Sequence, residues 1–294
     1  MAARRRGHRA TARPTRRRRR HPVRRPAVLA AVPLRPRSVA VLALASVVGV
    51  IMLFWPLVLR VDPGATERVD PPFLFLVLLP LILVVVLAEV SEGGMDARVL
   101  AVLGVLTAVN AVLRALSAGT AGVELVFFLL VLGGRVFGPG FGYVLGCTSL
   151  FASALLTAGV GSWLPFQMLV AAWVGMGAGL LPRRITGRAE LAMLVGYGVL
   201  ACYAYGLLMN MWGWPFIAGI QVPGQDSSEL AYVPGAPAAE NLHRFLIYTL
   251  LTSTGGWDTA RALTTALAIA LLGPAVLSTL RRAARTARVV RTDT

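Results

Sequence analysis

Isolated ionisable and amide side chains stand inside otherwise apolar stretches of this 294-residue sequence. Arg114 follows Asn110 by four positions, which places both on the same face of a helix. Glu124 opens the next apolar stretch and is close enough in sequence to pair with Arg114 around the turn 117–122. Because a charge within a membrane-spanning helix is costly, such residues predict a functional site by default.

Other polar residues lie at the ends of further apolar stretches. Gln167 stands near the start of one stretch and Asn210 near the end of another. Asp258 precedes Arg261 by three positions at the start of the last stretch, a spacing that allows a local ion pair. For the charged residues, ion pairs that only stabilise helix ends remain the alternative, since an Arg side chain near an interface can extend its head into water.

Tryptophans also lie at the outer ends of the predicted helices, near these polar residues. Four of the six tryptophans lie at predicted outer helix ends: Trp163, Trp212, Trp214 and Trp257. An aromatic belt at the membrane interface accounts for them individually. A belt does not account for the three amide side chains at positions 110, 167 and 210, which lie about a turn further inside.

No enzyme signature accompanies these residues. The sequence has no GxSxG elbow, no phosphate-binding loop, no HExxH and no acid pair beside an accessible His. Cys147 and Cys202 lie in apolar runs, where a thiol packs as a small hydrophobic group. We therefore predict no catalytic residue, no cofactor and no metal site. If the protein transports a solute, it does not hydrolyse ATP itself.

The elements that position these residues are predicted to be membrane-spanning helices. Hydrophobic residues make up 56% of the chain and charged residues 14%. A bilayer core about 30 Å thick requires roughly 20 predominantly apolar residues per helix. Eight runs approach that pattern: 39–59, 72–90, 98–118, 122–134, 139–158, 164–181, 190–212 and 257–280. The run 122–134 is short for a span.

Charge placement indicates the orientation. All 29 basic residues are Arg, and fourteen of them fall between Arg4 and Arg37, which predicts that 1–38 is a disordered tail touching anionic headgroups. Such a tail needs no nucleic acid as partner. If the tail is cytoplasmic, the inner segments carry ten Arg and the outer segments three. This distribution favours eight crossings with both termini cytoplasmic.

Small residues recur at helical spacing. A turn is predicted over 133–142. From within this turn glycine recurs every four residues, at Gly138, Gly142 and Gly146, and the same spacing returns later in the chain at Gly175 and Gly179. Glycines four apart let a neighbouring helix backbone come close. A second face of small residues lies on the run 98–118, with Ala97, Ala101, Gly104 and Ala108. Such a face predicts a helix partner, in this chain or in another protein.

A change of character near residue 95 predicts the domain organisation. The runs before it are uniformly apolar, whereas those after it are glycine-rich and carry the isolated polar side chains. We expect a tail over 1–38, an accessory transmembrane hairpin over 39–94 and a working module over 95–294. The outer segment 213–256 is too long for a simple connection. Within it, 241–253 is expected to lie at the interface or fold back as a cap, not to span.

The module 95–294 resembles the substrate-binding S component of energy-coupling factor (ECF) vitamin transporters. The residues that carry the resemblance are Gly134-Arg135-Val136-Phe137-Gly138-Pro139 with Gly142 and Gly146, then Gly161-Ser162-Trp163-Leu164-Pro165-Phe166-Gln167-Met168, and Ser253 to Asp258 with Arg281-Arg282. The resemblance implies an all-α membrane protein: a six-helix bundle, here preceded by two additional transmembrane helices, in the plasma membrane of a bacterium.

The resemblance also implies a function. S components bind a vitamin or related micronutrient near the outer surface and work with a transmembrane T component and two cytoplasmic ATPases. The implied substrate-binding residues are Asn110, Arg114, Glu124, Trp163, Gln167, Asn210, Trp257 and Asp258, with 213–256 as a lid. The implied contact with the T component is the face formed by Ala97, Ala101, Gly104 and Ala108. The added hairpin raises the question whether that face stays free.

Two matters stay open from the sequence. The large outer segment and the four outer tryptophans suit a sizeable ring system such as cobalamin, but thiamin-like pyrimidines, riboflavin and pantothenate remain possible. Arg114 favours an anionic group if Glu124 does not neutralise it. The alternative function is a non-transport membrane scaffold, in which the small-residue faces serve assembly and the Arg tail recruits a cytoplasmic partner.

Overall fold

The structure is a computed structural model that describes residues 35–58, 71–92, 95–117, 122–217, 230–233 and 235–289. Within these ranges all regular secondary structure is helical, as an all-α protein requires. The predicted Arg-rich tail, 1–38, lies outside the described residues up to position 34.

The helices follow one another in the predicted order. Their bounds are α1 (Pro36–Leu53), α2 (Trp55–Val58), α3 (Pro71–Glu92), α4 (Ala97–Ser117), α5 (Val126–Phe137), α6 (Pro139–Leu156), α7 (Leu164–Leu180), α8 (Arg188–Ile217), α9 (Ala238–Thr249), the π-helical stretch η2 (Leu250–Asp258) and α10 (Thr259–Val289). Each of the eight predicted apolar runs coincides with a helix.

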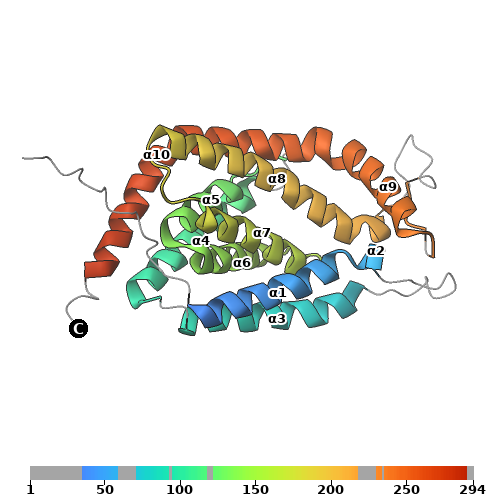
Figure 1. The fold of residues 1–294 in the computed structure, drawn as a ribbon, viewed down its shortest axis with the longest axis horizontal. Helices are drawn as coiled ribbons and strands as arrows, with labels where there is room; N and C mark the ends of the chain where they lie inside the picture. Colours follow the sequence, from blue (N-terminus) through green and yellow to red (C-terminus); the bar gives the residue numbers. More distant parts are fainter. Residues whose placement is uncertain are drawn as a thin grey trace, which may run out of the picture.

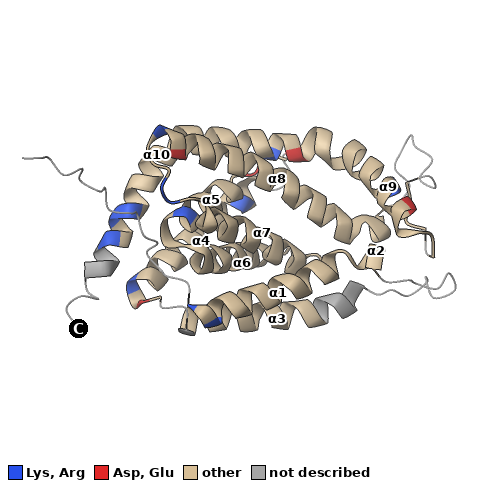
Figure 2. Ribbon diagram, viewed as in Figure 1, with Lys and Arg blue, Asp and Glu red and all other residues tan. Residues whose placement is uncertain are grey.

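Most helices run side by side along the long axis of the molecule (Figure 1). In this view α1 and α3 form one edge, α8 and α10 form the opposite edge, and α4 to α7 lie between them. The short helix α9 marks one end, called the α9 end below, and the last turns of α10 bend away at the other. Basic residues gather at that second end (Figure 2), called the basic end.

Five helical segments are long and apolar enough to cross a membrane, which confirms an all-α membrane protein: Pro36–Leu53, Ala97–Ser117, Pro139–Leu156, Arg188–Ile217 and Ala238–Arg285. Three apolar segments are shorter: Val77–Ser91, Val126–Phe137 and Leu164–Leu180. At 1.5 Å per residue the 12 residues of α5 extend about 18 Å, well short of the bilayer core. Every residue of α5 is buried by its neighbours, so it needs no lipid contact.

The last helix begins earlier than the sequence predicted. Residues 241–253 were expected at the interface or as a cap, but α9 continues through η2 into α10 as one helical segment. The paired glycines Gly255 and Gly256 lie within η2 and do not end the helix. Phe245 and Tyr248 of α9 pack with Trp214 of α8. The segment is therefore a helical extension of α10 toward the α9 end.

Glycines bring α6 and α7 into backbone contact, as their spacing predicted. A Cβ atom on Gly142 would collide with the carbonyl of Gly175, and one on Gly146 would lie 2.5 Å from that of Ala171. Gly138 begins α6 with φ of 113°, a conformation that favours glycine, and Pro139 follows at the first helical turn. These close approaches hold the three buried helices α5, α6 and α7 together.

A buried charge cluster closes the basic end. The Arg135 side chain donates to Glu190 (2.7 Å) and to the carbonyls of Leu181, Pro182 and Ile185 at 3.0 to 3.2 Å. Arg281 of α10 donates to the same carboxylate at 2.6 and 2.7 Å. One glutamate thereby joins α5, the α7–α8 connection, α8 and α10.

The hairpin of α1 and α3 packs on the side of the bundle formed by α6, α7 and α8. The indole of Trp173 donates to the Ser46 hydroxyl at 2.9 Å. Gly49 lies so close to Leu169 that a Cβ atom there would collide with its side chain. Specific contacts with α7 thus fix α1 against the helix bundle.

Glycine-to-alanine substitutions test the close contact between α6 and α7. Each adds one methyl group and raises helix propensity, but only a methyl group at a close contact also causes a clash. Gly146→Ala should lower stability by about 1–3 kcal/mol, because the new Cβ overlaps the α7 backbone. Gly196→Ala is the matched control, since a Cβ there meets nothing within 4 Å and alanine favours a helix. Thermal unfolding in detergent should show a lower midpoint for Gly146→Ala and an equal or higher one for Gly196→Ala. Equal midpoints would contradict the backbone contact.

Candidate functional site

Arg114 is held between two helices by neutral side chains. Its guanidinium donates to the hydroxyl of Ser153 on α6 at 2.7 Å and to the amide oxygen of Gln167 on α7 at 3.1 Å. Ser153 is fully buried, whereas Arg114 and Gln167 are half-buried. The sequence singled out Arg114 and Gln167, and the structure brings them into contact.

A polar column continues from Arg114 along the α4–α6 interface. Thr107 and Thr148 share a hydrogen bond of 2.7 Å between their hydroxyls. Asn110 is 0% exposed, and neither its amide oxygen nor its amide nitrogen has a hydrogen-bond partner. The hydroxyl of Ser149, on the facing helix, is likewise buried without a partner. Buried groups left unpaired are costly, so this column has donors and acceptors to offer a ligand.

Arg261 forms a second cluster with two carboxylates. It donates to Asp258 at 2.8 Å and to Glu124 at 3.0 Å, and the Ser253 hydroxyl donates to the other oxygen of Asp258 at 2.9 Å. The predicted Asp258–Arg261 pair is therefore confirmed. The Arg261 guanidinium also lies over the rings of Phe127 and Tyr205, 5.6 and 5.1 Å from their centroids. Such stacking suits a desolvated cation.

Two glycines and a π-helix create the space for this cluster. Asp258 ends η2, and its carboxylate occupies the space that a side chain on Gly206 of α8 would need. Gly122, with φ of 84°, turns the chain so tightly against Trp257 that a Cβ would lie 2.5 Å from the Trp257 carbonyl. π-helical segments are rare and often occur at functional sites.

The expected pair of Arg114 with Glu124 is wrong. Glu124 binds Arg261, which approaches it from α10, and not the arginine that is nearer in sequence. Within the described part of the chain, no carboxylate lies within ion-pair distance of Arg114. The positive charge of Arg114 is consequently left without a counter-charge at a half-buried position.

Tyr205 belongs to the Arg261 cluster. Its ring packs edge-on against Phe127, with centroids 4.9 Å apart. The Arg261 guanidinium lies over the same Tyr205 ring. Arg114 is bonded between α4, α6 and α7, whereas the Arg261 cluster lies among α8, η2 and α10 beside Phe127 of α5. These two sets together are called the polar region below.

The other predicted site residues do not join these clusters. The side-chain nitrogen of Asn210 is buried without a hydrogen-bond partner and bonds to neither described cluster. Trp163 and Trp257 are 43% and 45% exposed, as expected of interface residues. Trp212 and Trp214 are buried among aromatic rings, and the Trp214 indole donates to the Leu230 carbonyl. Packing, or an interface belt, accounts for all four tryptophans.

The small-residue face of α4 is uncovered. Ala97, Ala101, Gly104 and Ala108 are all exposed, and a Cβ added at Gly104 would meet nothing within 4 Å. Val105 and Leu116, on the same exposed side of α4, are 63% and 76% exposed. The hairpin packs elsewhere on the bundle, so it leaves this face free.

Sequence reasoning missed four contributors: Ser153, Ser253, Tyr205 and the bridging role of Arg261. Ser149 and Ser153 stand four apart on α6, and that polar spacing within an apolar helix was a usable signal. Tyr205 carried none, since a tyrosine in an apolar helix is usually a packing residue. Arg261 was recognised only as the local partner of Asp258.

Comparison with known families gives one result. A family model described as "ECF transporter, substrate-specific component" matches residues 98–284. The match begins at α4 and ends within α10, so α1 to α3 lie outside it. Neither the curated proteins nor the solved structures contain a match to this chain.

Removing the cation between two carboxylates should be strongly destabilising. Arg261→Gln leaves Glu124 and the buried Asp258 facing each other unpaired, and we expect a loss of about 3–5 kcal/mol. The control Glu240→Gln breaks the exposed Arg244–Glu240 pair and should change stability by less than about 0.5 kcal/mol. Thermal unfolding measures both.

If Arg261→Gln gives too little folded protein, Asp258→Asn provides the second test, because it removes one of the two charges and keeps the shape. It should also lower the unfolding midpoint clearly below that of Glu240→Gln. Equal unfolding midpoints for the buried-cluster variants and the control would show that the cluster does not stabilise the folded protein.

Proposed function

The chain belongs to the family of ECF transporter substrate-specific components, and we propose that it captures a vitamin-like micronutrient in the polar region around Arg114. In this proposal the ligand enters near the α9 end and is released to the other side with the help of a T component and two cytoplasmic ATPases. The protein itself is a multi-pass membrane protein and contributes binding, not chemistry.

The uncompensated charge of Arg114 is the observation that carries this assignment. Arg135 has a glutamate and three carbonyls, and Arg261 has two carboxylates, whereas Arg114 bonds, among the residues that the structure describes, to the neutral groups of Ser153 and Gln167. A cation in a low-dielectric site gains most from an anionic partner. An incoming carboxylate or phosphate would supply that partner.

The neighbouring groups narrow the ligand chemistry. Asn110 offers an acceptor and two donors one turn from Arg114, which suits a ligand with an amide-like edge beside its anionic group. Pantothenate carries a carboxylate and an amide, and cobalamin carries a phosphodiester and amides, so both remain candidates. Thiamin is a cation and would be repelled by Arg114. The predicted substrate-binding set thus reduces to a centre of Asn110, Arg114 and Gln167.

Glu124 and Asp258 have a positioning role in this proposal. Both are engaged by Arg261, which fixes η2 against α5 and α8. The extension formed by α9, within the predicted lid 213–256, starts from η2. A ligand that displaced these contacts would alter the position of α9, and the polar region would open or close accordingly.

The exposed face of α4 is the proposed contact with the T component. Small side chains at Ala97, Ala101, Gly104 and Ala108 allow another helix to approach the α4 backbone closely. The accessory hairpin, proposed for residues 39–94, packs on α6, α7 and α8 and leaves the α4 face exposed. The excess of arginine at the basic end supports a cytoplasmic location for that end and for both termini.

Neutralising Arg114 should weaken ligand binding without unfolding the protein. We would screen pantothenate, cobalamin, riboflavin and thiamin for a rise in the unfolding midpoint of the purified chain, since a ligand that binds only the folded state stabilises it. The vitamin that stabilises the wild type should bind Arg114→Gln about 10- to 100-fold more weakly.

Arg184→Gln is the matched control, because Arg184 is exposed in the α7–α8 connection away from the polar column. It should bind like the wild type. Stabilisation by thiamin alone, or by an anionic vitamin equally in Arg114→Gln, would contradict the role of Arg114. A chain that no vitamin stabilises would favour the scaffold alternative.

A bulky residue on the α4 face should block assembly and spare ligand binding. Gly104→Trp projects into open space, so the chain should fold normally. Copurification of the T component from co-expressing cells should fall by more than about tenfold, for which a loss of about 1.4 kcal/mol suffices. Gly196→Trp, also in open space but on α8, should retain the complex. Equal complex yields for the two variants would place the contact elsewhere.

A further inference from the structure

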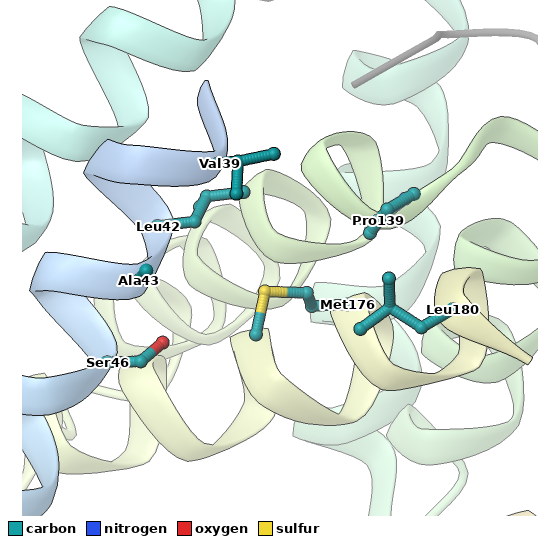
Figure 3. A pocket seen from close by; sticks show the side chains of 7 residues that line it. All are labelled: Val39, Leu42, Ala43, Ser46, Pro139, Met176 and Leu180. Atoms are coloured by element: carbon teal, nitrogen blue, oxygen red, sulfur yellow. The ribbon is translucent and has the colours of Figure 1, made fainter. Parts of the chain in front are cut away.

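An apolar groove separates the accessory hairpin from the module near the basic end. Its lining residues are Val39, Leu42, Ala43 and Ser46 of α1, Pro139 of α6, and Met176 and Leu180 of α7. Figure 3 shows the α1 side chains facing those of α6 and α7 across an open space. The groove has a volume of about 190 Å³, and apart from the Ser46 hydroxyl its lining side chains are hydrocarbon or thioether.

The groove arises because α1 and α7 touch at one level and separate at another. The helices are in contact at Gly49 and Leu169, and the Ser46–Trp173 hydrogen bond lies about one turn further along. From Ser46 toward the start of α1 the groove lies open between Val39, Leu42 and Ala43 on one side and Met176 and Leu180 on the other. The groove therefore follows α1 for about two turns, from Ser46 to Val39.

The residues near one end of the groove are basic, whereas those that line its interior are apolar. Arg35 and Arg37 stand at the start of α1, within four residues of Val39. Arg183, which donates to the carbonyl of Gly179, and the exposed Arg184 follow the lining residue Leu180 by three and four positions. Glu89 of α3 is 2% exposed and bonds to Ser38, so its carboxylate is buried within the hairpin. Four arginines thus stand next to the lining segments at this end of the groove, which is called its mouth.

We propose that this groove binds one anionic phospholipid, with an acyl chain along α1 and the phosphate at the arginines of the mouth. An apolar groove inside a transmembrane bundle is accessible to lipid chains, and basic clusters at the end of such bundles attract anionic headgroups. A neutral lipid would fill the groove equally but would gain nothing from the arginines. The combination of a hydrocarbon interior and a cationic mouth matches the chemistry of phosphatidylglycerol.

The bound lipid bridges the two parts of the chain. One wall of the groove belongs to the hairpin and the other to the module matched by the family model. The lipid therefore strengthens the contact between α1 and α7 at the level where the protein supplies few contacts of its own. This role does not depend on ligand binding at Arg114 or on assembly with a T component.

Lipid counting by native mass spectrometry tests the proposal. The full-length chain in detergent is titrated with phosphatidylglycerol or with phosphatidylcholine of the same acyl chains. We expect the first phosphatidylglycerol to bind about fivefold more tightly for each arginine that contacts it. Ala43→Phe fills the groove and should reduce the affinity for the first lipid at least fivefold. Ala43 is exposed, so the variant should fold.

Two variants complete the design. Ala270→Phe makes the same change at an exposed position of α10 and should bind like the wild type. The double variant Arg37→Gln/Arg184→Gln should lose the preference for phosphatidylglycerol and bind both lipids alike.

Three results would overturn the proposal: equal affinity of the wild type for the two lipids, unchanged binding in Ala43→Phe, or a preference that survives the double arginine variant. A wild-type dimer that Ala43→Phe converts to a monomer, with lipid binding unaffected, would instead assign the groove to a second copy of the chain.

Discussion

A charge inside this helix bundle must find its partner within the protein, because the surrounding hydrocarbon offers none. Two of the three interior arginines meet that constraint. Arg135 is bound by Glu190 and by three carbonyls, and Arg261 is bound by Glu124 and Asp258. In the described part of the chain, Arg114 bonds to a serine and a glutamine and to no carboxylate. The functional proposal follows from that difference, since the missing counter-charge is what a ligand would supply.

The two satisfied arginines also hold the architecture that presents the third. The Arg135 cluster joins α5, α8 and α10 at the basic end, and the Arg261 cluster joins α5, α8 and η2 toward the α9 end. Between them, glycine contacts bring α6 against α7, the two helices that supply Ser153 and Gln167. Arg114 on α4 is thus placed against two closely packed helices, while α9 precedes the π-helical stretch η2.

Local pattern predicted much of the fold and part of the site. Apolar runs located the eight helices, Gly138 with Pro139 located the α5–α6 turn, and the three-residue spacing located the Asp258–Arg261 pair. The choice between Arg114 and Arg261 as partner of Glu124 could not be made in this way. It depends on how α10 packs against α5, a contact between segments 137 residues apart. The helical extension through Gly255 and Gly256 was missed because glycines commonly end a helix, whereas here they lie within η2.

Native mass spectrometry of the detergent-purified chain, with an absorption spectrum of any small molecule released from it, tests the central claim most directly. The account predicts a bound molecule of vitamin size that carries a carboxylate or phosphate group. A neutral or cationic ligand, or a chain that is free of any small molecule and stays so when vitamins are added at micromolar concentration, would contradict the role assigned to the unpaired charge of Arg114.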